Sequence, residues 1–310
     1  MSSSTPARRA EVADVADGQE LHLKARILTE VLPYIKMHRG QTVVIKFGGN
    51  AMEDHDVRRM FASDVVLMRY VGIQPVIVHG GGPQITEYMK RLSKEVTFVG
   101  GHRVTDSETM EIAKMVLVGK VNKDIVSLIN RHGTLSMGLS GDDGNLIMAS
   151  KRLSEEGEDI GWVGNVSSIN SQIIEKLLSY ELIPVIASVG TDMEGNSYNI
   201  NADIVAGEVA IAVNASKIIY MTDVKGILDA SGDLISQLDA EGCKRMLESG
   251  EVSKGMIPKV ASCLRAVENG VARATVLDGT VLHALLLEVF TDEGVGTMIT
   301  MNGGEGDGGS

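Results

Sequence analysis

The chain has 310 residues, with 29 Lys and Arg against 41 Asp and Glu, so its formal net charge is −12. This acidity argues against nucleic acid or an anionic membrane as a partner. Hydrophobic residues make up 44% of the chain, which excludes disorder throughout and allows one large α/β domain or two of ordinary size.

The two ends of the chain are polar, and the body between them is predicted to fold. Residues 1–18 are small and charged and residues 302–310 are mostly glycine, so we expect both to be disordered tails. The folded body, 19–301, opens with a helical pattern over 19–38. Pro33 removes a backbone donor in the middle of this helix and predicts a kink. Because the helix precedes the first strand, it either covers the sheet or reaches a neighbouring subunit.

Short apolar strands alternate with helical patterns along the body. Such alternation predicts a mostly parallel sheet that helices cover on both faces. The longest helical pattern follows Thr105-Asp-Ser-Glu108, which has the spacing of a capping box, and it runs to about Arg131. The strand-like runs are 42–47, 75–79, 183–188 and 217–222.

Two glycine clusters each follow an apolar strand immediately. They are Lys46-Phe-Gly-Gly49 and His79-Gly-Gly-Gly-Pro83. Ligands of open α/β sheets bind at the carboxyl ends of strands, and glycines let backbone N–H groups approach an anion without obstruction. Pro83 suits the first turn of a helix whose positive end faces that anion. The clusters therefore predict a phosphate or carboxylate cradle, with tight turns that need positive φ as the alternative.

Two lysines and an Asn/Asp segment add charge and polarity near these turns. Lys46 ends its strand, and Lys259 opens a helical pattern in Gly255-Met-Ile-Pro-Lys259. Each lysine alone could extend to water, but together they could straddle a transferring phosphoryl group and neutralise its oxygens. Asn199-Ile-Asn-Ala-Asp203 is either a helix cap or a set of amides for a substrate, with a carboxylate that orients the lysines.

The sequence predicts no metal site of its own and no membrane segment. Cys243 and Cys263 form no Cys-x-x-Cys pair and lie near no histidine cluster, which argues against structural zinc and a disulfide framework. There is no leader pattern and no run of about 18 or more mainly apolar residues. We therefore expect a cytoplasmic protein, or one of the plastid stroma if the source is photosynthetic.

Five short motifs occur in this order along the chain: Lys46-Phe-Gly-Gly49, His79-Gly-Gly-Gly82, Gly101-His-Arg-Val104, Asn199-x-Asn-x-Asp203 and Gly255-Met-Ile-Pro-Lys259. Together they resemble the amino acid kinase family, and most closely its acetylglutamate kinases, over about 24–300. The resemblance implies an α/β fold, a three-layer αβα sandwich with a mostly parallel open central sheet. It also implies an N-lobe over about 40–200 for substrate binding and dimerisation, and a C-lobe over about 201–301 for ATP.

This resemblance implies roles for individual residues, with N-acetyl-L-glutamate as the substrate. Lys46 and Lys259 flank the moving phosphoryl group, and Asp203 orients both lysines. Arg103 and Asn199 hold the α-carboxylate of the substrate, while the backbone amides of Gly81 and Gly82 hold its γ-carboxylate. The implied ATP contacts are Lys46, Gly48, Gly49, Thr222, Asp223, Gly226 and Lys259.

The implied reaction is the ATP-dependent phosphorylation of the γ-carboxylate to N-acetyl-L-glutamyl 5-phosphate, in arginine biosynthesis. A carboxylate is already a nucleophile at neutral pH, so no general base is required. We expect His79 to be a turn residue or a residue that lies behind the substrate contacts. Mg²⁺ is expected to arrive on the ATP phosphates, because the sequence shows no dedicated carboxylate cage.

Two segments resemble those of arginine-inhibited acetylglutamate kinases: the helix with Leu32-Pro-Tyr-Ile35 and the segment 283–297. Those relatives are hexamers, trimers of dimers linked by their N-terminal helices. The resemblance implies the same homo-oligomer here, with L-arginine as inhibitor bound by Tyr34, Glu288 and Gly294. Without the family, Glu288 in its apolar run suggests a strand residue that faces solvent. Some relatives bind a PII-type regulator, and no feature of this sequence decides whether this chain does.

Two other functions stay open at this point. The chain could be another amino acid kinase, such as a glutamate 5-kinase, or a non-catalytic arginine sensor on the same fold. A sensor would not need Lys46, Asp203 and Lys259, which argues against that reading. Arg103 favours an acetylglutamate-like substrate because a guanidinium can bind a carboxylate through two hydrogen bonds; its alternative is a surface ion pair.

Overall fold

The computed structural model describes residues 21–302, with gaps at 53, 230, 254 and 293. Its framework is an eight-stranded sheet. The strands are β1 (Thr42–Phe47), β2 (Gln74–His79), β5 (Ser136–Leu139), β8 (Ile183–Ala187), β11 (Lys217–Thr222), β12 (Gln237–Asp239), β13 (Arg273–Asp278) and β14 (Thr297–Thr300). They lie in the order β12-β14-β13-β11-β1-β2-β8-β5. All neighbours are parallel except β13 and β14, which are antiparallel.

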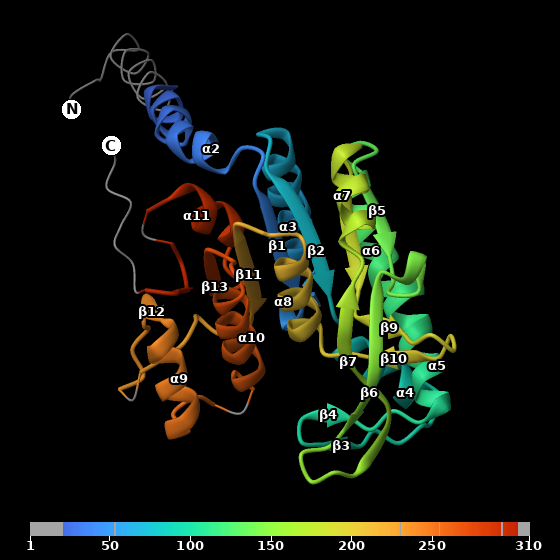
Figure 1. Ribbon diagram of the computed structural model, residues 1–310. Helices are drawn as coiled ribbons and strands as arrows, with labels where there is room; N and C mark the ends of the chain where they lie inside the picture. The colour runs from blue at the N-terminus through green and yellow to red at the C-terminus, as the bar shows by residue number, and fades with distance from the viewer. Residues whose placement is uncertain (1–20, 53, 230, 254, 293, 303–310) are drawn as a thin grey trace, which may run out of the picture.

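Helices cover both faces of this sheet (Figure 1). Strands β1, β8 and β11 are apolar along most of their length because each is buried on both faces. The helices over one face are α3 (His55–Tyr70), α4 (Gly82–Arg91), α5 (Ser107–Lys114), α6 (Asn122–Asn130) and α11 (Ala284–Phe290). Those over the other face are α7 (Ser171–Ser179), α8 (Ala202–Ala212), α9 (Ala240–Ser249) and α10 (Ile257–Glu268). The predicted αβα sandwich with a mostly parallel sheet is confirmed.

A second, smaller β unit lies beside the sheet and was not predicted. It is a closed barrel in the order β10-β7-β6-β9. Its strands are β6 (Ile147–Leu153), β7 (Asp159–Ile169), β9 (Val189–Thr191) and β10 (Ser197–Asn199). The short hairpin of β3 (Phe98–Val99) and β4 (His102–Arg103) lies close to β6 and β7 (Figure 1). Two 3-10 turns, η1 (Gly49–Met52) and η3 (Asp143–Asn145), complete the short elements.

The long helix predicted after Thr105 is present, but its start differs. It runs from α5 through a π-helical turn, η2 (Met115–Val121), into α6. The capping-box prediction is wrong because Asp106 is the N-cap, and its carboxylate accepts a backbone N–H of the first turn at 2.8 Å. Glu108 does not reach back to the helix start, since its carboxylate pairs with Lys94 Nζ at 2.7 Å.

The N-terminal helix protrudes from the body (Figure 1). Residues 21–30 are helical, the assigned helix is interrupted at Val31, and α2 (Leu32–His38) continues with Pro33 in its first turn. Val31 keeps helical φ and ψ, and its N–H bonds to the Ile27 carbonyl at 3.2 Å, so the kink at Pro33 stays a prediction. The base of the helix contacts α11. Farther out, Leu28 is 71% exposed, so the helix keeps much of its apolar surface uncovered.

Part of the sequence prediction falls outside the described residues. The tail at 1–18 lies there, and of the tail at 302–310 only Asn302 is described. Of the helices that the structure does describe, none is long and apolar enough to span a bilayer.

Helices α8 and α10 each carry one predicted site residue and pack closely at a glycine. Asp203 lies in the first turn of α8, and Lys259 lies in the first turn of α10. A Cβ on Gly207 would lie 2.4 Å from Ser262 Oγ. The missing side chain at this position therefore sets the separation of the two helices.

The variant Gly207→Ala tests this packing. Alanine within a helix normally stabilises by about 0.5–1 kcal/mol relative to glycine. Here the new methyl group overlaps the Ser262 hydroxyl, so we expect the free energy of unfolding to fall by about 1–3 kcal/mol instead, measured by urea denaturation. In a Ser262→Ala background the effect should shrink, because the clashing oxygen is absent. A Gly207→Ala protein as stable as the wild type contradicts the close approach.

Candidate active site

Residues distant in sequence meet at the carboxyl edge of the sheet, around a cavity of about 230 Å³. Strands β1 and β2 end there in their glycine turns, and helices α4 and α8 begin there. This edge is where open α/β sheets bind ligands. The predicted site residues that line the cavity are Lys46, Gly48, Gly49, Gly81, Gly82, Arg103 and Asn199.

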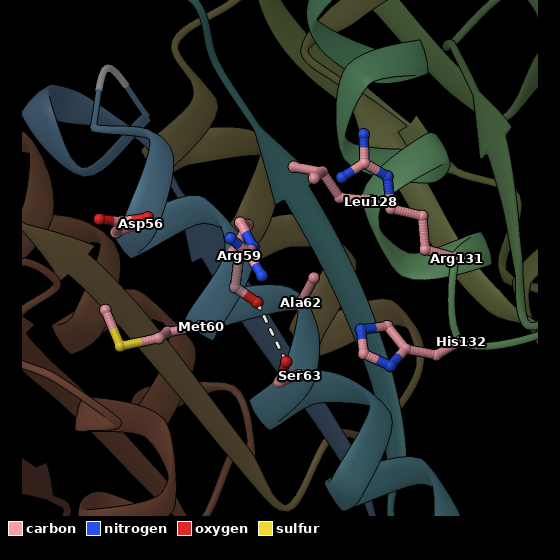
Figure 2. A pocket seen from close by; sticks show the side chains of 8 residues that line it. All are labelled: Asp56, Arg59, Met60, Ala62, Ser63, Leu128, Arg131 and His132. Atoms are coloured by element: carbon pink, nitrogen blue, oxygen red, sulfur yellow. Dashed lines mark hydrogen bonds between the residues drawn. The ribbon is translucent and has the colours of Figure 1, made fainter.

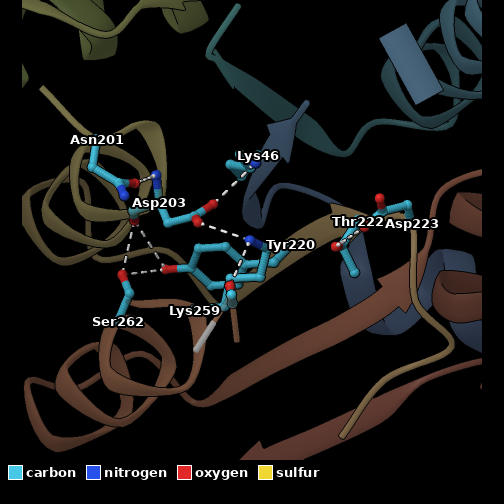
Figure 3. Close-up of polar contacts among 9 residues, drawn as sticks. Lys46, Asn201, Asp203, Tyr220, Thr222, Asp223, Lys259 and Ser262 are labelled. Carbon is cyan, nitrogen blue, oxygen red and sulfur yellow. Dashed lines mark hydrogen bonds and ion pairs between the residues drawn. The ribbon is translucent and has the colours of Figure 1, made fainter. Parts of the chain in front are cut away.

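The Asp203 carboxylate lies between the two predicted lysines (Figure 3). Its Oδ1 is 3.0 Å from Lys46 Nζ, and its Oδ2 is 3.2 Å from Lys259 Nζ. Asp203 and Lys46 are buried, whereas the side chain of Lys259 is 16% exposed. The structure thus brings together three residues that lie on β1, α8 and α10.

The two lysines keep this buried carboxylate ionised. Burial by itself would raise the pKa of the Asp203 carboxyl, because the charged form loses its hydration. The charges and hydrogen bonds of Lys46 and Lys259 outweigh burial and hold the pKa of Asp203 below its usual value. At neutral pH the cluster of three therefore carries one net positive charge.

Further contacts fix the start of α8. Asn201 caps this helix, since its Oδ1 accepts the Asp203 N–H at 2.7 Å. This confirms the helix-cap alternative for part of the Asn/Asp segment. From α10, Ser262 Oγ donates to the Asp203 carbonyl at 2.8 Å, and Tyr220 Oη lies 2.6 Å from Ser262 Oγ. The sequence analysis missed both Ser262 and Tyr220. Ser262 could have been found, because it follows Lys259 by about one helical turn and so lies on the same face of its helix.

The glycine turns bring the backbone into positions where a side chain would interfere. A Cβ on Gly48 would lie 2.7 Å from Lys46 Nζ, so any other residue there would displace the ammonium group. Gly49 has φ +71°, a backbone conformation that favours glycine. Gly82 begins α4, and Pro83 lies in its first turn as predicted. The start of α4 therefore presents backbone N–H groups and positive dipole to the cavity, which suits oxyanions.

Arg103 is a buried cation beside the glycine turn, so the surface ion-pair alternative is wrong. Its Nη2 donates to the Gly82 carbonyl at 3.0 Å and to Thr86 Oγ1 at 2.8 Å. The Phe98 ring lies 4.8 Å from the guanidinium carbon. Within the described chain, burial lowers the pKa of Arg103 and no carboxylate charge opposes that effect. The guanidinium stays charged and remains available to an anionic ligand.

Of the remaining predicted contacts, one lies at the cavity and three lie elsewhere. Asn199 lines the cavity from β10, whereas Thr222, Asp223 and Gly226 are not among the described residues that line it. Thr222 ends β11, and its hydroxyl donates to Asp223 Oδ1 at 3.2 Å. Gly226 has φ +152°, and a Cβ there would lie 2.6 Å from Thr297 Oγ1. This glycine therefore lets the loop after β11 pack on β14.

Tyr34, Glu288 and Gly294 belong to a different part of the molecule, near the amino end of β11. Glu288 is buried on helix α11, so the solvent-facing strand alternative is wrong. Its Oε1 accepts from Lys217 Nζ at 2.6 Å. A Cβ on Gly294 would lie 2.8 Å from Glu288 Oε2. The hydrogen bond from Tyr34 to Asp292 raises the pKa of that tyrosine and ties the N-terminal helix to the same loop.

Four other hollows, lined by described residues, contain none of the predicted site residues. A cavity of about 480 Å³ lies between α3 and the end of α6 (Figure 2). Its basic residues, Arg59, Arg131 and His132, are exposed. Across the described ranges, no three His, Cys, Asp or Glu side chains gather as metal ligands. The predicted catalytic and substrate-binding residues thus lie together at the carboxyl edge, around Asp203.

Solved structures share this architecture. The structure of smu.665 from Streptococcus mutans UA159 matches with a TM-score of 0.72 and 32% identity, covering 84% of this chain and 99% of that chain. N-acetylglutamate synthase from Neisseria gonorrhoeae matches with a TM-score of 0.81 and 24% identity, covering 90% of this chain. Our chain covers 63% of the synthase chain, and this likeness shows the fold alone.

Sequence comparison is more specific. A model of the amino acid kinase family matches residues 41–278. The acetylglutamate kinase of Caldanaerobacter subterraneus subsp. tengcongensis is 53% identical over 285 residues, which cover 91% of this chain and 94% of that protein. The acetylglutamate kinase of Aquifex aeolicus is 51% identical over 295 residues, which cover 91% of this chain and 99% of that protein. This chain is therefore a kinase that belongs to the amino acid kinase family and, within it, to the acetylglutamate kinases.

Proposed function

We propose that this enzyme transfers the γ-phosphoryl group of ATP to the γ-carboxylate of N-acetyl-L-glutamate, as a step of arginine biosynthesis. The observation that carries the proposal is the Asp203 carboxylate between Lys46 and Lys259, beside an open glycine cradle. Such a site offers positive charge and N–H donors to two anionic substrates that must approach each other. The names of the relatives support the same substrate.

The reaction needs charge compensation rather than a base. A γ-carboxylate oxygen attacks the γ-phosphorus and forms the new P–O bond, the bond to the β–γ bridging oxygen breaks, and ADP leaves with that electron pair. No proton moves, because the nucleophile is already ionised at neutral pH. Lys46 and Lys259 neutralise the phosphoryl oxygens. Asp203 pairs with both ammonium groups and so offsets the repulsion between them.

Arg103 and Asn199 are the proposed partners of the substrate α-carboxylate. Both line the cavity, and Arg103 retains donors because its Nη1 contacts only the weak acceptor Met89 Sδ, at 3.4 Å. The backbone amides of Gly81 and Gly82, at the start of α4, are the proposed donors to the γ-carboxylate. This arrangement would hold the substrate by both ends, with the reacting oxygen nearest the lysines.

For ATP we propose phosphate contacts from Lys46, Lys259 and the Gly48–Gly49 turn. Contacts to the rest of the nucleotide would come from Thr222, Asp223 and Gly226, in a C-lobe over about 201–301, while the N-lobe over about 40–200 holds the amino-acid substrate. Beside Gly49, no described atom other than those of its chain neighbours lies within 4 Å of the place of a Cβ, and this space fits phosphate oxygens. Mg²⁺ would be bound by the ATP phosphates and would supply further neutralising charge.

We also propose inhibition by L-arginine, bound between the N-terminal helix and α11 in a hexameric assembly. Two observations support a site for a cation there: Glu288 Oε2 lies beside Gly294, and the side chain of Tyr34 bonds to Asp292 in the same loop as Gly294. Lys217 already occupies Oε1 of Glu288, so the incoming guanidinium would bind the other oxygen. The exposed apolar residues of the protruding helix support its use in assembly.

The variant Lys259→Ala tests the phosphoryl-transfer proposal. The wild type should release ADP with N-acetyl-L-glutamate and not with free L-glutamate, measured in a coupled ADP-release assay. Removing one of the two cations should lower kcat by about 100-fold or more, because it acts on charge that develops during transfer. Lys244→Ala, an exposed lysine on α9, is the control and should keep wild-type kcat.

Three outcomes would contradict this assignment. Turnover with free L-glutamate alone would indicate another amino acid kinase. L-Arginine binding without any turnover would indicate a sensor. Wild-type kcat in Lys259→Ala would remove the proposed transition-state role of that lysine.

The variant Arg103→Lys tests the substrate contact. A lysine cannot keep the bonds to Gly82 and Thr86 and also present a planar pair of donors to a carboxylate. We expect the KM for N-acetyl-L-glutamate to rise about 10-fold or more while the KM for ATP stays unchanged. Arg91→Lys, on the exposed side of α4, is the matched control and should change neither constant. An unchanged KM for N-acetyl-L-glutamate in Arg103→Lys would refute the contact.

Removal of residues 1–38 tests the proposed inhibition. The truncated protein lacks Tyr34 and the protruding helix, so it should sediment below a hexamer and lose sensitivity to L-arginine in the ADP-release assay. The full chain, measured in the same buffer, is the reference for both properties. A truncated protein that is still a hexamer and still fully inhibited would refute both proposals.

A further inference from the structure

The imidazole of His79 lies fully buried beneath the glycine turn that follows β2. Its Nδ1 is 2.9 Å from the carbonyl oxygen of Gly80, and its Nε2 is 3.0 Å from Asn122 Nδ2. Neither nitrogen faces solvent, and the proposed reaction uses neither. The two contacts join the start of α6 to the turn that lines the cavity.

The amide of Asn122 can take only one orientation here. Its Nδ2 lies 2.9 Å from the Val185 carbonyl oxygen and 3.4 Å from that of Leu139. Both are acceptors with no proton to give, so the NH₂ group must face them and the amide oxygen must point away. On that other side Lys123 Nζ donates to Asn122 Oδ1 at 3.2 Å.

This orientation decides which nitrogen of His79 carries the proton. Because Asn122 Nδ2 donates toward Nε2, Nε2 must accept, and in a neutral imidazole the proton is then on Nδ1. Nδ1–H donates to the Gly80 carbonyl. Burial and the nearby charge of Lys123 lower the pKa of His79 to about 4, so the ring is neutral at physiological pH.

The Gly80 carbonyl in turn sets the direction of the next N–H. In a trans peptide unit the C=O and the following N–H point in opposite directions. The Gly80 oxygen is held toward the buried ring, so the Gly81 N–H points away from it. No described residue accepts a hydrogen bond from this N–H, and Gly81 lines the cavity.

We propose that His79 and Asn122 are positioning residues that aim the Gly81 N–H into the cavity, as a donor to the carboxylate oxygen that receives the phosphoryl group. The proposal rests on the proposed function for the identity of the acceptor. His79 and Asn122 touch no substrate, and they act through the Gly80–Gly81 peptide.

The π-helical turn η2 supports the same peptide from its other side. A Cβ on Gly81 would lie 2.8 Å from Leu117 Cδ2 and 3.2 Å from Val121 Cγ2. The hydrogen bonds of a π-turn span five residues, which is the spacing from Leu117 to Asn122. The wide turn thus lets one helix pack apolar atoms against Gly81 and also deliver the amide to His79.

Kinetics of matched variants test this chain of hydrogen bonds. Asn122→Leu keeps the side-chain volume but removes the donor, and kcat should fall by about 100-fold while the KM for ATP stays within twofold of wild type. Asn130→Leu is the control at the far end of α6, where the amide makes four partly buried hydrogen bonds but none to the glycine turn. It should lose stability and keep kcat. Equal kcat for both variants would overturn the proposal.

Two variants of His79 provide a rescue comparison. An asparagine amide can occupy the place of Nδ1 and donate to the Gly80 carbonyl, whereas a glutamine amide reaches the place of Nε2. We expect His79→Asn to retain at least about tenfold more kcat than His79→Gln, although glutamine fills the space better. The reverse order would indicate a role in packing alone and overturn the proposal.

The ¹⁵N spectrum of the wild-type imidazoles tests the tautomer without substrate or turnover. The resonance that disappears in His79→Gln should show a protonated Nδ1 and an unprotonated Nε2 between pH 6 and 8. A proton on Nε2 in that range would overturn the proposal. Absence of wild-type turnover with N-acetyl-L-glutamate would refute the proposed function alone, because the spectrum reports on His79 directly.

Discussion

One buried carboxylate holds together the parts of this molecule that do its chemistry. Asp203 would be costly to bury as an anion, and Lys46 and Lys259 would be costly to bring close as cations. Each charge is tolerable only because the other two are present. The strand β1 and the helices α8 and α10 must therefore meet at one point, and the close α8–α10 packing at Gly207 is part of meeting that requirement.

Much of this arrangement follows from local sequence signals. Apolar runs gave four of the eight strands of the main sheet, β1, β2, β8 and β11. The carboxyl ends of parallel strands share one edge, which placed Lys46 beside the glycine turn after β2. The residue types of Lys259 and Asp203 allowed a site with Lys46 as one alternative, but the family resemblance was needed to choose it, because no pattern along the chain indicates that α8 and α10 cross.

What the sequence could not predict is set by contacts far along the chain. Two strands of the small barrel, β9 and β10, have only three residues each, too few to show an alternation of apolar and polar residues. The longer β6 and β7 pair with register shifts, which break the alternation along them. Thr105 has capping-box spacing, yet Asp106 is the N-cap of the helix. Glu108 pairs with Lys94 and therefore does not return to the helix start, as a capping box would require. His79 suggested a turn residue, and only the carbonyls of two other strands reveal why its ring faces Asn122.

Strand β11 touches both charged clusters. Lys217, its first residue, binds Glu288, and Tyr220, three residues on, bonds to Ser262 and to the Asp203 carbonyl. At about 3.3 Å per residue the two contacts lie roughly 10 Å apart on one extended backbone. That backbone is bonded to β1 and β13 on its two sides and cannot change its length. One extended strand thus connects the Glu288 ion pair to the first turn of α8, where the Tyr220 hydroxyl meets the Asp203 carbonyl.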